Sequence, residues 1–169
     1  MRALCIAIST AACALLASTA SAADPPPASL PPADQAAAFR AAGFSKRGGQ
    51  WHSKCEDPGT PSYTPGAIET VKDLNGDGQL EAVITEGGTF CYGDAGQGYW
   101  LVGKQAGGAW KLIANGTGMA SFLDTRGAGG WPDLEVGGPG FCFPVERWNG
   151  KEYKLQRYEY EGKPCKPGS

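Results

Sequence analysis

An internal repeat is the feature that most limits how this chain can fold. The segment DLNGDGQLE at 73–81 is matched by DTRGAGGWPD at 124–133, and the Phe-Cys pair at 90–91 is matched by another at 141–142. The first aspartates of the two segments lie 51 positions apart, and so do the two cysteines. A period near fifty residues with several short apolar runs in each copy is typical of repeated antiparallel sheets.

Each copy ends in a predicted β-hairpin. In the first copy, runs at 100–105 and 110–113 flank an Ala-Gly-Gly-Ala turn. In the second copy, runs at 145–148 and 151–155 flank Asn149-Gly150. An Asn-Gly pair between alternating runs predicts a tight type I′ turn, because both central residues then need positive φ.

The composition and the repeat together predict a mainly β fold. Twenty-six glycines and thirteen prolines are too many for a helical bundle and favour short strands joined by turns. The two copies span about 67–113 and 118–158, and two blades cannot close a propeller ring. We therefore expect two blade-like antiparallel sheets around one core with an aromatic filling, which we assign to Trp100, Trp110, Trp148 and Tyr153.

One short N-terminal helix is predicted over residues 34–42. Asp34 is a suitable N-cap, the segment is rich in alanine, and Gly43 is suited to end the helix. This helix begins a single β-rich domain, which we place at 34–165.

The first 33 residues precede that domain. Arg2, an apolar run at 3–17 and the small residues at 20–22 have the layout of a secretory signal peptide cleaved near Ala22. The apolar run is too short to span a bilayer. Residues 23–33 form a predicted proline-rich linker. The sequence therefore predicts a periplasmic or secreted protein.

Four cysteines lie in the predicted domain, and an even number in an exported chain indicates two disulfides. Three pairings are possible, and the shorter loops favour Cys55–Cys91 with Cys142–Cys165. A zinc site is disfavoured because the four form no Cys-x-x-Cys pair and the sequence has one histidine, His52.

Oxygen-bearing side chains alternate in the first repeated segment, at Asp73, Asn75 and Asp77. The backbone carbonyl of Gln79 and the carboxylate of Glu81 continue the series. Calcium takes six to eight oxygen ligands and tolerates irregular geometry, so these five positions predict a calcium loop. The alternative is a metal-free turn, since Asp and Asn favour turns.

The loop differs from an EF-hand. The twelfth position is Ile84, inside an apparent strand, where an EF-hand has a bidentate Glu followed by a helix. The pattern D-x-N-x-D-G-x-x-E before a strand instead resembles the FG-GAP or VCBS repeat, the calcium-loop blade of integrin α-chain propellers and many exported bacterial proteins. That resemblance implies one structural calcium ion, held through positions one, three, five, seven and nine. Position nine is usually Asp, so Glu81 departs from the pattern.

The second copy of the loop has lost its donors. Arg126 and Ala128 stand where the first copy has Asn75 and Asp77. The guanidinium of Arg126 can fill the metal position by pairing with Asp124 and Asp133, so we expect one metal site rather than two.

The sequence favours a non-catalytic role, with one enzymatic alternative. We expect His52 to pack as a ring beside Trp51 rather than act as a base. Two carboxylate pairs leave a small hydrolase as an alternative, and we expect them to be turn and strand-edge charges. These pairs are Asp133 with Glu135 and Glu86 with Asp94.

A ligand-binding role fits the sequence better than catalysis. The formal net charge of −2 and the absence of a basic stripe disfavour nucleic-acid and anionic-membrane partners. Tyr92, Tyr99 and Trp131 form a candidate face for a ligand. We therefore expect an exported small β-domain that binds calcium and serves adhesion or the binding of a protein or glycan. A periplasmic carbohydrate-binding module or protein inhibitor is the alternative.

Overall fold

The structure is a computed structural model that describes residues 29–168. The predicted signal peptide at 1–22 and residues 23–28 of the predicted linker lie outside the described residues. Within 29–168, no helix is long and apolar enough to cross a membrane.

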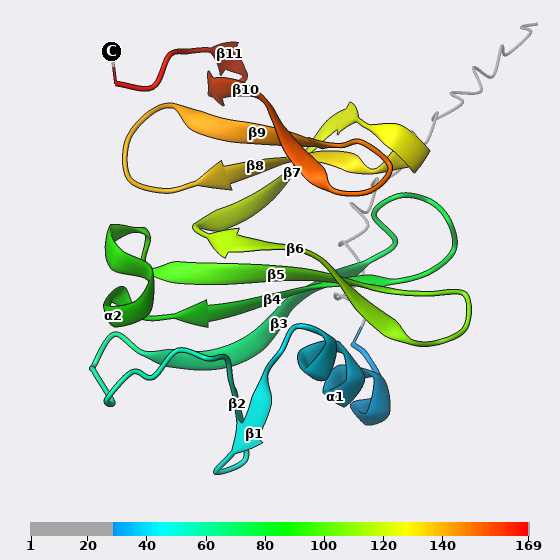
Figure 1. The fold of residues 1–169 in the computed structure, drawn as a ribbon, viewed down its shortest axis with the longest axis vertical. Coiled ribbons are helices and arrows are strands. Elements are labelled where there is room, and N and C mark those ends of the chain that lie inside the picture. Colours follow the sequence, from blue (N-terminus) through cyan, green and yellow to red (C-terminus); the bar gives the residue numbers. More distant parts are fainter. Residues whose placement is uncertain (1–28, 169) are drawn as a thin grey trace, which may run out of the picture.

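Two antiparallel sheets make up the fold, and in each the strands lie in chain order (Figure 1). The first sheet contains β1 (Ser45–Arg47), β2 (Gln50–His52), β3 (Thr64–Lys72), β4 (Glu81–Gly87), β5 (Gln97–Lys104) and β6 (Trp110–Thr117). The second contains β7 (Met119–Arg126), β8 (Pro132–Gly137), β9 (Phe143–Trp148), β10 (Tyr153–Tyr160) and β11 (Lys163–Pro164). The prediction of a mainly β fold with two antiparallel sheets is confirmed, and the sheets divide at Gly118.

The helices of the described chain are short. They are α1 (Pro32–Ala41), α2 (Thr89–Tyr92) and the 3-10 turns η1 (Gly93–Ala95) and η2 (Ala128–Gly130). Helix α1 begins before the predicted residue 34, because proline is tolerated in the first turn of a helix. Leu30 is also buried, so the folded part starts inside the predicted linker.

The sequence suggested Asp34 as the N-cap of α1, but the N-cap is Pro31. Asp34 lies in the first turn, and its carboxylate accepts hydrogen bonds from Lys104 Nζ at 2.9 Å and Trp110 Nε1 at 3.1 Å. Asp34 therefore fastens the helix to the β5–β6 hairpin instead of satisfying the helix backbone.

Both predicted hairpins are present, but one turn differs from the prediction. Trp148 pairs with Tyr153 at the end of β9 and β10, which leaves a loop of 149–152. The side chain of Asn149 accepts the backbone N–H of Lys151 and of Glu152, and Gly150 has a φ of 99°. Positive φ is absent at Asn149, so the type I′ turn is wrong, and an Asx turn takes its place.

The buried apolar side chains form two clusters, one on each face of the first sheet. Helix α1 covers one face, where Phe39, Phe44, Ile84 and Trp110 are buried. The second sheet covers the other face, where Leu101, Leu134 and Tyr153 are buried. The four aromatic residues predicted to fill the core divide between the clusters: Trp100 and Trp110 on the helix side, Trp148 and Tyr153 between the sheets.

Each sheet has its own disulfide, with the predicted pairing. Cys55–Cys91 joins the segment after β2 to α2, and Cys142–Cys165 joins the start of β9 to the C-terminal segment. Two disulfides in a domain of this size are typical of an oxidising compartment outside the cytosol.

Candidate functional site

The predicted calcium loop connects β3 to β4 and is shaped by its own polar side chains. The carboxylate of Asp73 accepts the backbone N–H of Gly76 at 2.7 Å and of Gly78 at 2.9 Å. Asn75 Oδ1 accepts the N–H of Asp77 at 2.9 Å, and Asp77 Oδ1 accepts that of Gln79 at 2.8 Å. These local bonds hold the alternating oxygens in one compact turn.

The donor set suits calcium chemically. All five predicted positions offer oxygen, and a carboxylate has acceptor capacity beyond one backbone hydrogen bond on each oxygen. Among residues 29–168, however, no three or more His, Cys, Asp or Glu side chains are grouped as a metal cluster would be. The calcium site therefore stays a prediction.

Glu81, the ninth position of the loop, is a buried carboxylate. It is 2% exposed, and its Oε2 accepts the backbone N–H of Leu74 at 2.8 Å. Burial, together with the nearby Asp77 and Asp73, raises the pKa of Glu81 to about 7. No ion pair within residues 29–168 includes it. Its negative charge has no positive partner in the described chain.

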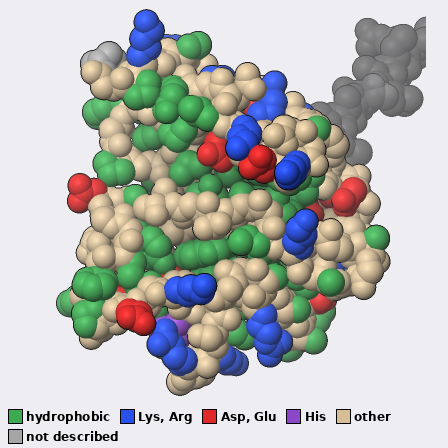
Figure 2. Space-filling model, in the orientation of Figure 1, with side chains coloured by type: hydrophobic (Ala, Val, Ile, Leu, Met, Phe, Trp, Pro, Cys, Tyr) green, Lys and Arg blue, Asp and Glu red, His purple; other side chains and the backbone are tan. Residues whose placement is uncertain are grey.

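Asp133 ends the second copy of the loop and is buried completely. Arg147 donates from Nε to Oδ1 and from Nη2 to Oδ2, both at 2.8 Å. Arg157 Nη1 and Thr125 Oγ1 donate to Oδ2 at 2.7 and 2.6 Å. The hydrogen bonds from Arg147 are the main reason that the pKa of Asp133 is well below its usual range. Figure 2 shows acidic and basic side chains gathered over the second sheet.

Arg126 does not pair with Asp124 and Asp133, so that expectation is wrong. Its Nη1 donates to the backbone oxygen of Leu74 at 2.6 Å and to that of Gly130 at 2.9 Å. The guanidinium thus reaches out of the second copy and holds the backbone of the first.

Gly130 brings the two loops into direct contact. Its φ is 78°, and a Cβ at this position would lie 2.5 Å from the backbone oxygen of Asn75. Only glycine allows both the left-handed backbone and this approach. The second loop therefore packs on the first.

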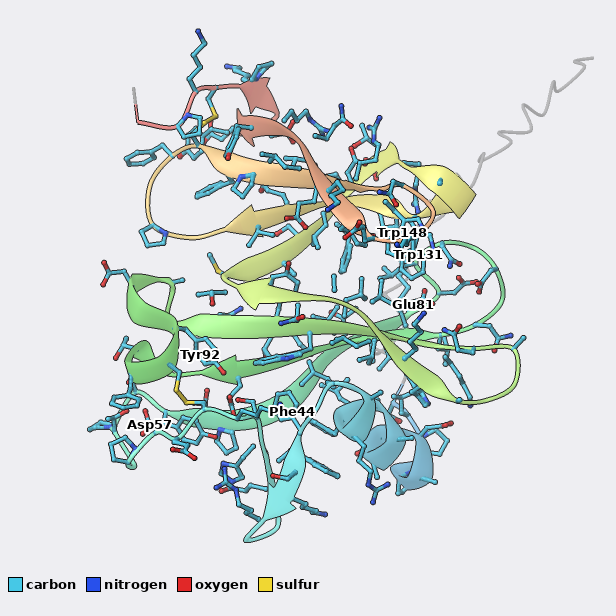
Figure 3. All side chains as sticks on the ribbon, in the orientation of Figure 1. Phe44, Asp57, Glu81, Tyr92, Trp131 and Trp148 are labelled. Carbon is cyan, nitrogen blue, oxygen red and sulfur yellow. A yellow bond between two sulfur atoms is a disulfide. The ribbon has the colours of Figure 1, made fainter. Side chains whose placement is uncertain are left out.

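The three aromatic residues of the predicted ligand face are not brought together. Tyr99 is 3% exposed, inside the cluster between the sheets. Figure 3 shows Tyr92, the last residue of α2, at one end of the strands and Trp131 at the opposite end, close to Trp148. The centroids of the Trp131 and Trp148 rings are 5.5 Å apart.

A polar cluster around Glu86 was not foreseen from the sequence. The Glu86 carboxylate is 1% exposed and accepts bonds from Ser53, Tyr63 and Tyr92, including the Ser53 backbone N–H at 2.9 Å and the Tyr63 hydroxyl at 2.7 Å. Because a carboxylate only accepts, the Tyr63 oxygen accepts in turn from His52 Nδ1, at 2.7 Å.

This cluster fastens two parts of the chain onto β4, namely the segment that follows β2 and the helix α2. It lies beside the Cys55–Cys91 disulfide. Its members are scattered between residues 52 and 92 and follow no spacing, so no sequence signal pointed to it. The ring of His52 stacks on that of Tyr63, with centroids 5.8 Å apart.

The two carboxylate pairs considered for hydrolysis have different surroundings. Asp133 is completely buried and accepts hydrogen bonds from Arg147, Arg157 and Thr125, so its carboxylate is enclosed by the protein. Its companion Glu135 is half-buried, and burial raises its pKa. Glu86 is enclosed by four donors, whereas Asp94 is exposed in η1. This arrangement favours structural roles for Asp133 and Glu86.

Comparisons of the chain with models of known protein families, with curated proteins and with solved structures find no match. The FG-GAP or VCBS resemblance of the loop stays a prediction, and function is inferred from the loop and its surroundings.

Proposed function

We propose that this protein is an exported β-domain that holds one structural calcium ion in the loop 73–81 and serves ligand binding or adhesion rather than catalysis. One observation carries the proposal. The buried carboxylate of Glu81 has no positive partner among residues 29–168, whereas Asp133, which ends the segment 124–133, has two arginines.

Electrostatics explain why this difference favours a cation. A buried charge is costly unless it is paired, and removing a partner from a buried pair destabilises a protein by about 3–5 kcal/mol. A calcium ion would supply the missing positive charge. The residues that would hold it are Asp73, Asn75, Asp77, Gln79 through its carbonyl, and Glu81.

A structural role follows from what the loop contacts. Arg126 donates to the backbone oxygen of Leu74, and Gly130 lies against that of Asn75. Both residues belong to the second copy, so an ion that fixes the loop also fixes the junction between the two sheets.

The test is calcium titration of protein that has been stripped with a chelator. Calorimetry should give a heat of binding, and the free energy of unfolding should rise by about 2.7 kcal/mol at a hundredfold excess of calcium over its dissociation constant. Magnesium, which needs stricter octahedral geometry, should stabilise less.

Two variants make the measurement specific. Glu81→Gln should abolish the calcium effect, and the control Asp94→Asn, an exposed acid outside the loop, should leave it intact. Wild-type protein that shows neither heat nor a gain in stability with millimolar calcium would overturn the proposal.

A further inference from the structure

A groove of about 310 Å³ opens between the calcium loop and the second sheet. Asn75 and Asp77 of the loop line it, together with Trp131 and Trp148 of the second half of the chain and residues 111–113 of β6. Lys111 and Lys151 also line it. Figure 3 shows Glu81, Trp131 and Trp148 at the same end of the molecule, where the loops of the two copies meet.

The two indoles form a fixed aromatic platform. Their planes are tilted by 40°, and Tyr153 packs behind them with its centroid 5.4 Å from that of Trp148 and 6.3 Å from that of Trp131. The Tyr153 hydroxyl donates to the Pro132 backbone oxygen at 2.9 Å, which holds this ring in place. Both indoles are half-buried, so each keeps part of its surface open.

The charge of the groove favours an anion. Lys111 and Lys151 are exposed, and neither forms an ion pair with another residue of 29–168. Asp77 is the one acidic residue among those that line the groove. Two lysines against one carboxylate leave a net positive charge, and an ion bound by Asp77 would increase it.

We propose that this groove binds a carboxylated sugar ring, such as a uronate unit of an acidic polysaccharide. The flat C–H face of a pyranose suits the indoles of Trp131 and Trp148. The sugar carboxylate suits Lys111 and Lys151, and its hydroxyls suit the side-chain amide of Gln105. The volume is at the lower end of the range for ligand pockets, which fits a single ring.

This inference deepens the proposed function and rests on it in one respect, since Asn75 and Asp77 belong to both the calcium loop and the groove wall. The lysines and the indoles belong to the groove alone. Calcium dependence and sugar recognition can therefore be separated by experiment.

The experiment is calorimetric titration of the full-length protein with trigalacturonate in 1 mM calcium, and again in chelator. The fully methyl-esterified trimer has the same rings without the charges and is the matched ligand control. Trigalacturonate should bind, and the ester should bind at least about tenfold more weakly, a difference of about 1.4 kcal/mol.

Paired variants locate the binding site. Lys151→Gln should weaken binding, whereas Lys163→Gln, an exposed lysine on β11, should not. Trp131→Phe should weaken binding about tenfold, whereas Trp51→Phe, which alters the helix-side cluster, should not. Lys151 is exposed, so its variant remains informative if Trp131→Phe impairs folding.

The outcomes distinguish the two proposals. Calcium binding without any binding of trigalacturonate overturns the proposal that the groove binds a sugar and leaves the calcium proposal intact. A third result is that the protein takes up no calcium but binds trigalacturonate through Trp131 and Lys151. This result supports sugar binding in the groove and overturns the calcium proposal. Equal binding of the ester, or no effect of either groove variant, overturns the sugar assignment.

Discussion

The loops 73–81 and 124–133 each end in a buried carboxylate, and the surroundings of the two carboxylates are opposite. Glu81 closes the first loop with backbone hydrogen bonds, and burial raises its pKa to about 7. Asp133 closes the second with Arg147 and Arg157, and its pKa falls below the usual range. Asp133 thus has permanent positive partners from the protein, whereas Glu81 has none among residues 29–168.

The largest expected effect is a difference in stability between variants of these two carboxylates. Without calcium at pH 8, Asp133→Asn should lower the free energy of unfolding by about 3 kcal/mol, because two arginines lose their buried partner. Glu81→Gln should cost less than about 1 kcal/mol, since it removes an unpaired charge and keeps an acceptor for Leu74. Denaturant unfolding in a chelator measures both.

Equal costs for these two substitutions in chelator would contradict the comparison, because Glu81 would then have a partner in the protein. The same pair in excess calcium should show a second difference: Asp133→Asn keeps the calcium stabilisation and Glu81→Gln loses it.

The next effect concerns the contact between the loops. Gly130→Ala should destabilise the protein by about 1–2 kcal/mol more than Gly129→Ala does. Both glycines have positive φ, 78° and 61°, so both substitutions carry the cost of a left-handed alanine. Only at Gly130 would the added methyl group meet a backbone oxygen, that of Asn75 at 2.5 Å, whereas the nearest atom at Gly129 is 3.8 Å away. Similar costs in thermal or denaturant unfolding would show that the loops do not press on each other.

The smallest predicted effect is a decrease in the free energy of unfolding at acidic pH. The folded pKa of Asp133 lies below the unfolded value of 3.8, so its contribution to stability is present above pH 3.8 and is lost as the pH falls toward the folded pKa. Between pH 5 and pH 3 this loss should be about 1 kcal/mol. Unfolding measured at both pH values should show it in the wild type, and the Asp133→Asn variant should have a correspondingly shallower slope.

The fold was predictable where the signal is local. Alternating runs on both sides of short turns located the β5–β6 and β9–β10 hairpins, and loop length selected the correct disulfides. The turn at Asn149 was misjudged because its side chain, rather than a left-handed backbone, satisfies the N–H groups of the loop. The start of α1 was misjudged because the capping role given to Asp34 is displaced by its contacts with Lys104 and Trp110, about seventy residues away.

In the candidate site, too, local contacts were predictable from the sequence and long-range contacts were not. The oxygens of the first loop bond to their own backbone, so their spacing in the sequence identified the turn. Glu86, by contrast, takes its donors from segments up to 33 residues away, and Arg126 bonds to a residue 52 positions distant. Such contacts depend on strand register and on how the sheets pack, which a single sequence does not specify.

The outer edges of the two sheets limit how far this architecture can extend. At one end lies β1, with three residues, and at the other β11, with two residues that include Pro164, beside the Cys142–Cys165 crosslink. Proline and short length leave few free backbone groups for an incoming strand. The two outer edges therefore offer little to an incoming strand, and the longer edge strands β6 and β7 lie where the chain crosses from one sheet to the other.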